Sequence, residues 1–430
     1  MQDKIRRVVI LGSNGTMGAG AAQVFAAAGC QVTMLARDLG KAEEGLRTVQ
    51  TAAKAEAIAE KIALGTYEHD LKAALREATF IFESLAEDLS LKRSFFERVD
   101  QVRRPDSIVA TGSSGLSIAS MAEGRSDSFR RHFLGVHLFN PPHLIVGTEV
   151  IPHGDTDAEV TGKVAELLRR RLGRKVIITR DRPAFVGNRV GFKFLNQAAQ
   201  LAQAHGVAYI DYLIGTQTGR AMPPLATIDL VGWDVHMAIV DNVFANCTDD
   251  EAHACFKLPE FMYHGIAQGQ LGDKTPKMGG FYRRYDKKIE VLDHTAGIYR
   301  QFEPPRPIEF VEKMKALHRV GKYKEAIEVL RTARGGDAEL CQRMVLGYVS
   351  YGLNRVGEVA LSSHDVDSIM CYGFNWTPPA VLADLFGHHE AIEMMRSFEL
   401  KVPRVLQEAA LQRRALFTGG MLDYGRTFAA

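Results

Sequence analysis

The chain has 430 residues, of which 46% are hydrophobic and 24% charged, and its formal net charge is +2 at pH 7. This length suggests two to four domains, and the composition is that of a folded chain rather than a disordered one. The near balance of charges argues against a nucleic acid as the main partner.

Five cysteines show no CxxC spacing, which argues against a disulfide scaffold or a structural zinc site, and we expect no metal. No apolar run approaches the ~18 residues of a membrane span. The apolar patch near the N-terminus is shorter than the roughly 7–15 residues of a signal-peptide core. We therefore expect a cytoplasmic protein with no membrane span.

The first predicted structural unit is a strand, a glycine-rich turn, a helix and a second strand. Residues 7–11 form a β-branched apolar run that ends in the turn GSNGTMG, and small residues then continue at helical spacing to Gly29. A second apolar run covers residues 31–35. Such a βαβ unit binds the pyrophosphate of a dinucleotide at its glycine turn, although an ordinary tight turn is the alternative. The predicted cofactor-binding residues of this turn are Gly12, Asn14, Gly15, Thr16, Met17 and Gly18.

The end of the second predicted strand bears on the choice of cofactor. An acidic residue there would bind the adenosine ribose hydroxyls, but Ala36 occupies that position and is followed by Arg37 and Asp38. Arg37 would suit the 2′-phosphate of NADP. It would equally suit stacking on adenine while Asp38 binds the ribose of NAD. The choice between NAD and NADP stays open at this point.

Further apolar runs alternate with helical patterns and predict a Rossmann-like α/β domain over residues 1–181. A charged, Ala-rich segment at 41–61 is expected to be helical, and strands are expected at 80–83, 107–110, 135–139 and 175–179. This alternation implies a parallel sheet covered on both faces.

The rest of the chain has a helical texture and contains two repeated motifs. NRVG occurs at 188–191 and 354–357, and PPLATIDLVG at 223–232 matches PPAVLADLFG at 378–387. Prolines at 304, 305 and 307 suggest a linker. We expect a helical domain over 182–303 and a second, shorter copy of it over 304–430. Asn354 in the second copy is expected to be structural.

Four features between residues 80 and 191 carry a resemblance to a known family. The run FIFE is followed by SLAEDLSLK, His137 precedes Leu-Phe-Asn-Pro-Pro, Glu149 follows in EVIP, and Asn188 lies in AFVGNRV. Residues 5–282 resemble the (S)-3-hydroxyacyl-CoA dehydrogenases of fatty-acid β-oxidation. The bacterial branch with the motif HFFNPP looks closest.

The resemblance implies an NAD-dependent oxidation of a 3-hydroxyacyl-CoA to a 3-oxoacyl-CoA. It implies four catalytic residues, Ser114, His137, Glu149 and Asn188, and cofactor contacts at Glu87 and Lys92. This sequence departs from the family in its glycine loop, which is one residue longer, and at Ala36. It also reads Gly112-Ser113 where the family has Asn-Thr.

The reaction requires side chains of these types. Removing a proton from an alcohol suits an imidazole base near neutral pH, here His137, and a carboxylate such as Glu149 fixes its tautomer and stabilises the imidazolium. Ser114 and Asn188 would donate hydrogen bonds to the substrate oxygen from two different domains. The active site is therefore expected in an interdomain cleft.

Each residue taken alone has a simpler interpretation. His137 would be a core histidine, Glu149 a strand-edge carboxylate, Ser114 part of a turn and Asn188 a helix cap. His143 is a competing base on the same segment. Two other functions stay open: a dehydrogenase of a small polar 3-hydroxy acid, like carnitine or gulonate dehydrogenases, and a nucleotide-binding protein without catalysis. The oligomeric state is expected to be a monomer or a homodimer.

Overall fold

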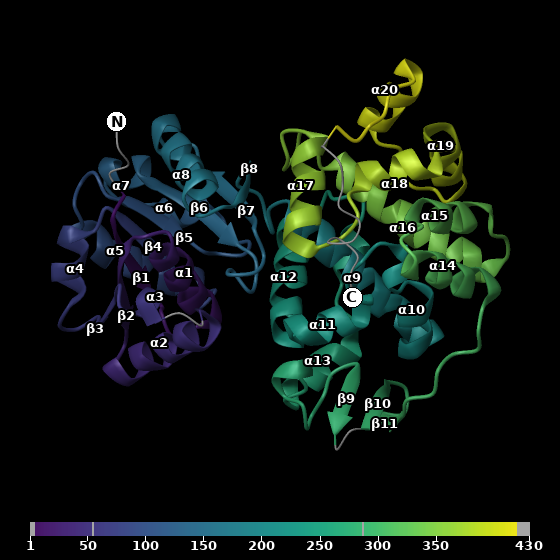
Figure 1. Ribbon diagram of the computed structural model, residues 1–430, viewed down its shortest axis with the longest axis horizontal. Helices are drawn as coiled ribbons and strands as arrows, with labels where there is room; N and C mark the ends of the chain where they lie inside the picture. Colours follow the sequence, from purple (N-terminus) through teal and green to yellow (C-terminus); the bar gives the residue numbers. More distant parts are fainter. Residues whose placement is uncertain (1–4, 54–55, 286–287, 419–430) are drawn as a thin grey trace. The chain divides into compact units, whose positions relative to one another are not determined.

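The computed structural model describes residues 5–53, 56–285 and 288–418. The chain divides into two compact units, Met1–Phe185 and Val186–Ala430 (Figure 1). The first is a Rossmann-like α/β unit and the second is mainly helical, which confirms the predicted fold class. Within the described ranges, no helix combines the length and apolarity needed to cross a membrane.

The first unit is built on an eight-stranded sheet with the strand order β3-β2-β1-β4-β5-β6-β7-β8. Its strands are β1 (Arg7–Leu11), β2 (Gln31–Ala36), β3 (Ile62–Thr66), β4 (Phe80–Glu83), β5 (Ile108–Thr111), β6 (Phe133–Leu138), β7 (Gly147–Pro152) and β8 (Lys175–Ile178). Neighbouring strands are parallel except β6 and β7, which are antiparallel. The sheet is thus mainly parallel, as expected, and the one antiparallel pair of β6 and β7 departs from the prediction.

Helices cover both faces of this sheet. They are α1 (Thr16–Ala27), α2 (Leu39–Ala53), α3 (Glu56–Ala59), α4 (Leu71–Glu77), α5 (Leu89–Val102), α6 (Ile118–Ala122), α7 (Asp127–Arg131) and α8 (Ala158–Arg170). Val8 and Ile10 of β1 join the apolar layer formed with α1, α2 and α8, whereas Val9 and Leu11 join the layer with α4 to α7. Buried side chains thus alternate between the two faces along one strand.

Two features of the first unit differ from the sequence-based prediction. The predicted helix at 41–61 is α2 and the short α3, with residues 54–55 outside the described part. The strand β3 was not predicted, and β7 was expected only as the return of the chain that brings Glu149 to His137. In β3 the short run IALGT contains a glycine and only three apolar residues, so its hydrophobic signal is weak.

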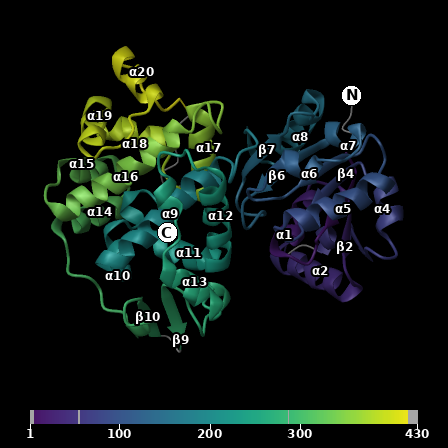
Figure 2. The same ribbon diagram turned by 180° about the vertical axis from the view of Figure 1, so that it is seen from behind.

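The second unit contains twelve α-helices in its described part, and Figure 2 shows them from behind. The first five are α9 (Gly187–His205), α10 (Val207–Leu213), α11 (Pro224–Val231), α12 (Trp233–Asn246) and α13 (Glu260–Ala267). The remaining seven are α14 (Glu309–Arg319), α15 (Tyr323–Thr332), α16 (Gly336–Asn354), α17 (Ser363–Phe374), α18 (Pro379–Phe386), α19 (His388–Ser397) and α20 (Arg404–Gln412).

In the sequence, a small antiparallel sheet lies between these two sets of helices. Its strands are β9 (Tyr282–Tyr285), β10 (Lys288–Asp293) and β11 (Ile298–Gln301). Most of the segment up to about residue 300 was expected to be helical, and the strands after α13 were not predicted. The segment with the prolines, residues 302–308, has no regular structure and leads into α14.

The repeated PP…G motif occupies equivalent positions in two helix pairs. In both α11 and α18 the second proline, Pro224 or Pro379, is the first helical residue. In both, the final glycine ends one helix with a positive φ and begins the next: Gly232 has φ +99° and Gly387 has φ +80°. Proline suits a first helical turn and glycine suits a positive φ, so the same local geometry follows from the same residues.

The aspartate inside each motif makes the same set of hydrogen bonds. Asp229 accepts from Trp233 Nε1 four residues later and from two consecutive backbone amides, those of Phe281 and Tyr282. Correspondingly, Asp384 is bonded to His388 Nε2 four residues later and accepts from the amides of Leu416 and Phe417. These matching contacts support an internal repeat.

The NRVG match is not equivalent in the two regions. Asn188 lies in the first turn of α9, whereas Asn354 is the last residue of α16. That part of the predicted repeat is therefore wrong. Asn354 Nδ2 donates to the carbonyl oxygens of Ser350 (2.9 Å) and Lys401 (3.0 Å), which is the structural role expected of it.

Helices of the two regions pack directly on one another within the second unit. The Thr377 amide donates to the Gly219 carbonyl at 2.8 Å, and Arg220 pairs with Trp376 in an isolated antiparallel bridge. The Arg220 guanidinium lies over the rings of Phe194 at 3.7 Å and Trp376 at 5.0 Å. Residues 304–430, called the third region below, thus cover an apolar face of the helical region at 182–303.

Candidate active site

His137 and Glu149 form a buried hydrogen-bonded pair in the first unit. They are direct partners in the register of the antiparallel strands β6 and β7. The His137 Nδ1 lies 2.7 Å from a Glu149 carboxylate oxygen, and the two residues are 4% and 0% exposed. The eleven residues between them form the remainder of a strand, a loop and the returning strand. The competing base His143 lies exposed in that loop.

Aromatic rings surround the imidazole. The ring centroids of Phe139 and Phe185 lie 4.7 Å and 5.8 Å from that of His137. Phe185 and Ala184 are both fully buried and both have positive φ angles, 49° and 61°. Such angles are uncommon for residues other than glycine and persist only where the surroundings hold them. Because Nδ1 of His137 bonds to Glu149, the other ring nitrogen, Nε2, takes no part in this bond.

The glycine turn after β1 is packed too tightly for larger residues. Gly12 has φ +82°, and a Cβ there would lie 2.2 Å from the Ser84 carbonyl oxygen; a Cβ at Gly18 would lie 2.3 Å from the Gly12 carbonyl oxygen. Gly15 precedes the first turn of α1 and supplies no capping side chain. Backbone N–H groups at such a helix start suit a phosphate group. Asn14, Thr16 and Met17 lie in the same turn and the start of α1.

Tyr67 holds this turn through a hydrogen bond. The sequence did not predict this role of Tyr67. Its hydroxyl accepts a hydrogen bond from the Gly12 amide at 2.7 Å. Burial raises the pKa of Tyr67 to about 12, so the hydroxyl stays protonated near neutral pH. Tyr67 directly follows the unpredicted strand β3, so no sequence signal indicated its position.

Arg37 and Asp38 are both exposed at the end of β2. Asp38 Oδ1 accepts the Lys41 amide at 2.8 Å, at the start of α2. The side chains are thus where the adenosine end of a dinucleotide lies in a Rossmann fold.

Lys92, predicted to contact the cofactor, is 1% exposed and forms a buried ion pair. Its Nζ lies 2.7 Å from a Glu83 oxygen and 3.4 Å from Glu87. Glu83, the last residue of β4, also accepts from Thr111 Oγ1 at 2.5 Å. Glu83 was not singled out from the sequence, although an acid that ends the apolar run FIFE was a usable signal. A direct cofactor contact of Lys92 stays a prediction.

Glu87 holds the loop that carries Ser114. One of its oxygens accepts from the Ser113 hydroxyl at 2.6 Å and from the Ser114 amide at 2.8 Å. The departure at Gly112 has a steric reason, because a Cβ there would lie 2.8 Å from the Phe82 ring. Phe82 therefore occupies the space that a side chain at position 112 would need.

The structure brings some of the predicted catalytic residues into defined contacts, but not all of them. His137 bonds to Glu149, and Ser114 is held by Glu87, all in the first unit. Asn188 is buried in the first turn of α9, in the second unit. Its meeting with the other three stays a prediction, as does the interdomain cleft.

Comparison with known proteins now identifies the family. Residues 7–182 match the sequence model described as "3-hydroxyacyl-CoA dehydrogenase, NAD binding domain", and residues 185–284 match that of the "C-terminal domain". The chain belongs to the 3-hydroxyacyl-CoA dehydrogenase family. The first unit is accordingly the NAD-binding domain of this family, which confirms the predicted resemblance and cofactor.

Individual dehydrogenases of the family match this chain over different lengths. A "Probable 3-hydroxyacyl-CoA dehydrogenase" of Bacillus subtilis is 29% identical over 450 residues, covering 95% of this chain and 54% of the relative. One of the same name from Deinococcus radiodurans is 34% identical over 295 residues, covering 65% of this chain and 83% of the relative. The chain thus spans about half the length of the Bacillus relative.

A solved structure supports the fold over almost the whole chain. The 3-hydroxybutyryl-CoA dehydrogenase of Escherichia coli K12 superposes with a TM-score of 0.70 at 19% identity and covers 95% of this chain and 99% of its own. At this identity the likeness concerns the fold, including a second helical region after the first.

Proposed function

We propose that this protein is an NAD-dependent 3-hydroxyacyl-CoA dehydrogenase, which interconverts a 3-hydroxyacyl-CoA and a 3-oxoacyl-CoA. The observation that carries the proposal is the buried pair of His137 and Glu149 on adjacent strands. Family membership supports the substrate class, since the relatives bear the names 3-hydroxyacyl-CoA and 3-hydroxybutyryl-CoA dehydrogenase.

The glycine turn fits the proposed cofactor. Gly12 and Gly18 leave room that a Cβ would fill, and the start of α1 offers backbone N–H groups to a pyrophosphate. Bound at this turn, NAD would supply the acceptor for the hydride that leaves the C3 carbon of the alcohol. Side chains of the protein carry out the proton transfer and the positioning of the substrate oxygen.

In this mechanism the Nε2 of His137 takes the proton of the substrate hydroxyl. Glu149 holds Nδ1–H, which fixes the tautomer and stabilises the imidazolium as it forms. The surrounding rings of Phe139 and Phe185 keep water from the imidazole. Ser114 and Asn188 donate hydrogen bonds to the substrate oxygen, which carries negative charge during ketone reduction.

The organisation of the whole chain is part of the proposal. We assign an NAD-binding domain to residues 1–181, a helical domain to 182–303 and a second, shorter copy to 304–430; residues 1–4 and 419–430 lie outside the described part. The matching contacts of Asp229 and Asp384 support the two copies. The acyl-CoA is the proposed partner, the cytoplasm the proposed location, and a monomer or homodimer the proposed assembly.

Steady-state kinetics test the activity. Acetoacetyl-CoA and longer 3-oxoacyl-CoAs should be reduced with NADH, while free acetoacetate and other free acids should react far more slowly. NADPH serves as the parallel cofactor. Turnover of free 3-hydroxy acids without turnover of thioesters would contradict the proposal, and no turnover of either would leave a nucleotide-binding protein.

A further inference from the structure

The helix that carries Asn188 begins without a capping side chain. Val186 precedes α9 and supplies no side-chain hydrogen bond to the first turn. The first N–H groups of a helix have no partner within it, and a missing cap typically costs about 1 kcal/mol of helix stability. The side-chain contacts of the residues in this turn therefore bear on its position.

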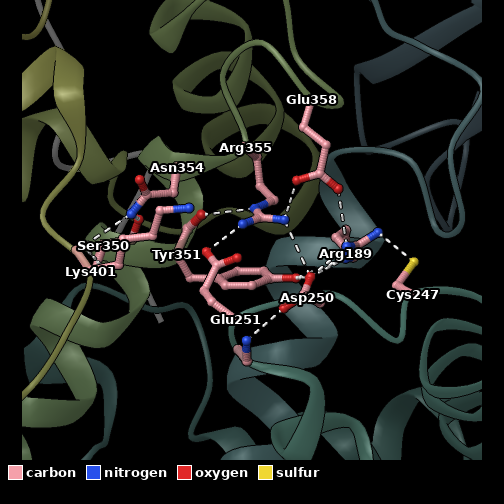
Figure 3. A network of polar contacts seen from close by, with 11 residues as sticks. Arg189, Cys247, Asp250, Glu251, Ser350, Tyr351, Asn354, Arg355, Glu358 and Lys401 are labelled. Atoms are coloured by element: carbon pink, nitrogen blue, oxygen red, sulfur yellow. Dashed lines mark hydrogen bonds and ion pairs between the residues drawn. The ribbon is translucent and has the colours of Figure 1, made fainter.

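Arg189, the next residue along, is anchored by a dense polar network (Figure 3). Its Nε donates to Tyr351 Oη at 2.8 Å and to Asp250 Oδ2 at 3.2 Å. Its Nη1 lies 3.1 Å from Cys247 Sγ, and Nη2 donates to Asp250 and to Glu358 at 3.2 Å. The Arg189 side chain is 2% exposed, so these bonds are made away from water.

Two of these partners, Tyr351 and Glu358, come from the third region of the chain. Tyr351 lies in α16 and donates its own hydroxyl hydrogen to Asp250 Oδ2 at 2.8 Å. The tyrosine thus bridges arginine and carboxylate. Glu358 follows α16 and reaches Arg189 from a partly exposed position.

Asp250 is the centre of the network, and two arginines share it. Arg355 Nη1 reaches Asp250 at 3.2 Å and also pairs with Glu358 and, through Nη2, with Glu251. Burial alone would raise the pKa of Asp250, but hydrogen bonds from Arg189 and the charges of both arginines hold it below its usual value. In Figure 3 both guanidinium groups point at this carboxylate. Asp250 therefore stays charged.

We propose that the third region positions Asn188 through this network, with Tyr351 and Glu358 as positioning residues that hold Arg189 and thereby the first turn of α9. The inference rests on the proposed function, in which Asn188 donates to the substrate oxygen. It gives the second helical copy a role in turnover beyond covering an apolar face. A donor displaced by a fraction of an ångström stabilises the transition state less well.

The test compares two tyrosines of one helix. Tyr351→Phe removes the hydroxyl that bridges Arg189 and Asp250. Tyr348→Phe, three residues earlier, removes a buried hydroxyl that donates to the Thr377 carbonyl at 3.0 Å and does not touch the network. We expect Tyr351→Phe to lower kcat for acetoacetyl-CoA reduction about tenfold and Tyr348→Phe less than about twofold, with the Kd of NADH unchanged in both.

Asn188→Ala provides the background that separates positioning from general destabilisation. If Tyr351 acts through Asn188, adding Tyr351→Phe to Asn188→Ala should change kcat by less than about twofold. Glu358→Gln, at a partly exposed site, should show the same pattern with a smaller loss.

Two results would overturn this inference while leaving the proposed function intact. One is a full tenfold loss from Tyr351→Phe in the Asn188→Ala background. The other is an equal loss from both tyrosine variants in an active enzyme. A folded wild-type protein that binds NADH and turns over no thioester would instead overturn the proposed function, and with it the role of Asn188.

Discussion

His137 and Glu149 are paired twice, once through the backbone and once through their side chains. They are opposite one another in the register of β6 and β7, and His137 Nδ1 lies 2.7 Å from the Glu149 carboxylate. Because the strand register fixes both backbones, the imidazole keeps one orientation without relying on a loop. The twelve-residue spacing is compatible with a strand, a turn and a returning strand, and the register adds that the two residues are direct partners.

His137→Gln should lower kcat by about 10²–10⁴-fold, the usual contribution of general acid–base catalysis. The Kd of NADH, measured by fluorescence, should change little, because the glycine turn is elsewhere. His143→Gln, on the exposed loop of the same hairpin, is the control and should keep near-normal turnover. A His137→Gln enzyme with more than a tenth of wild-type kcat would move attention to His143.

Arg37→Ala tests how the adenosine end of the cofactor is held. Family membership favours NAD, and the exposed Arg37 would then stack on adenine, so its loss should weaken NADH and NADPH by similar factors. If Arg37 grips a 2′-phosphate, NADPH should weaken far more than NADH. Titrations of both cofactors against the variant and the wild-type protein distinguish these outcomes.

Lys92→Met should destabilise the protein by about 3–5 kcal/mol, because it leaves the buried Glu83 carboxylate without its cationic partner. The double variant Glu83→Gln/Lys92→Met should recover much of that loss. Lys41→Met removes an exposed ion pair with Glu44 and should cost at most about 1 kcal/mol. Denaturant unfolding measures all three, and a Lys92→Met protein of wild-type stability with weaker NADH binding would show that Lys92 serves the cofactor instead.

The sequence predicts best where residue type and local geometry are coupled. The turn at Gly12 requires a positive φ and a close backbone approach, and the prolines and glycines around α11 and α18 fix the same helix boundaries twice. These signals are local, so they can be read without knowing the partners.

Contacts between distant segments were predicted less well. The ion pair of Glu83 and Lys92 joins a strand end to a helix, and the bond from Gly12 to Tyr67 joins the turn after β1 to a residue after β3. The NRVG repeat misled because four matching letters fall at opposite ends of their helices. Partners of this kind depend on the register of strands and helices, which hydrophobic periodicity does not specify.

Removing the third region should expose an apolar face. Phe194 is fully buried, and its ring lies 5.4 Å from that of Trp376 and 6.0 Å from that of Tyr348. A chain ending at residue 306 should therefore aggregate or form a new dimer, which light scattering and sedimentation detect. A truncated protein that stays monomeric, soluble and fully active would contradict the covering role of residues 308–430.

A buried acid in α17 should make stability depend on pH. Asp367 is 3% exposed and accepts the Ala380 amide at 3.0 Å, and burial raises its pKa from 3.8 to about 8. A group with a raised pKa in the folded state contributes stability that is complete below its unfolded value, near pH 4, and is lost as the pH rises through about 8.

Asp367→Asn should therefore flatten the fall of Tm between pH 5 and 9, because the amide keeps an oxygen for the Ala380 amide and never ionises. Burial also raises the pKa values of Asp211 and Asp229, each to about 7, so the wild-type curve falls in more than one step. The difference between wild type and variant above about pH 7.5 isolates Asp367. Glu393→Gln, at an exposed site of α19, should leave the curve unchanged. Differential scanning fluorimetry across this pH range decides the matter, since parallel curves for wild type and Asp367→Asn would mean that Asp367 is ionised in the folded protein at neutral pH.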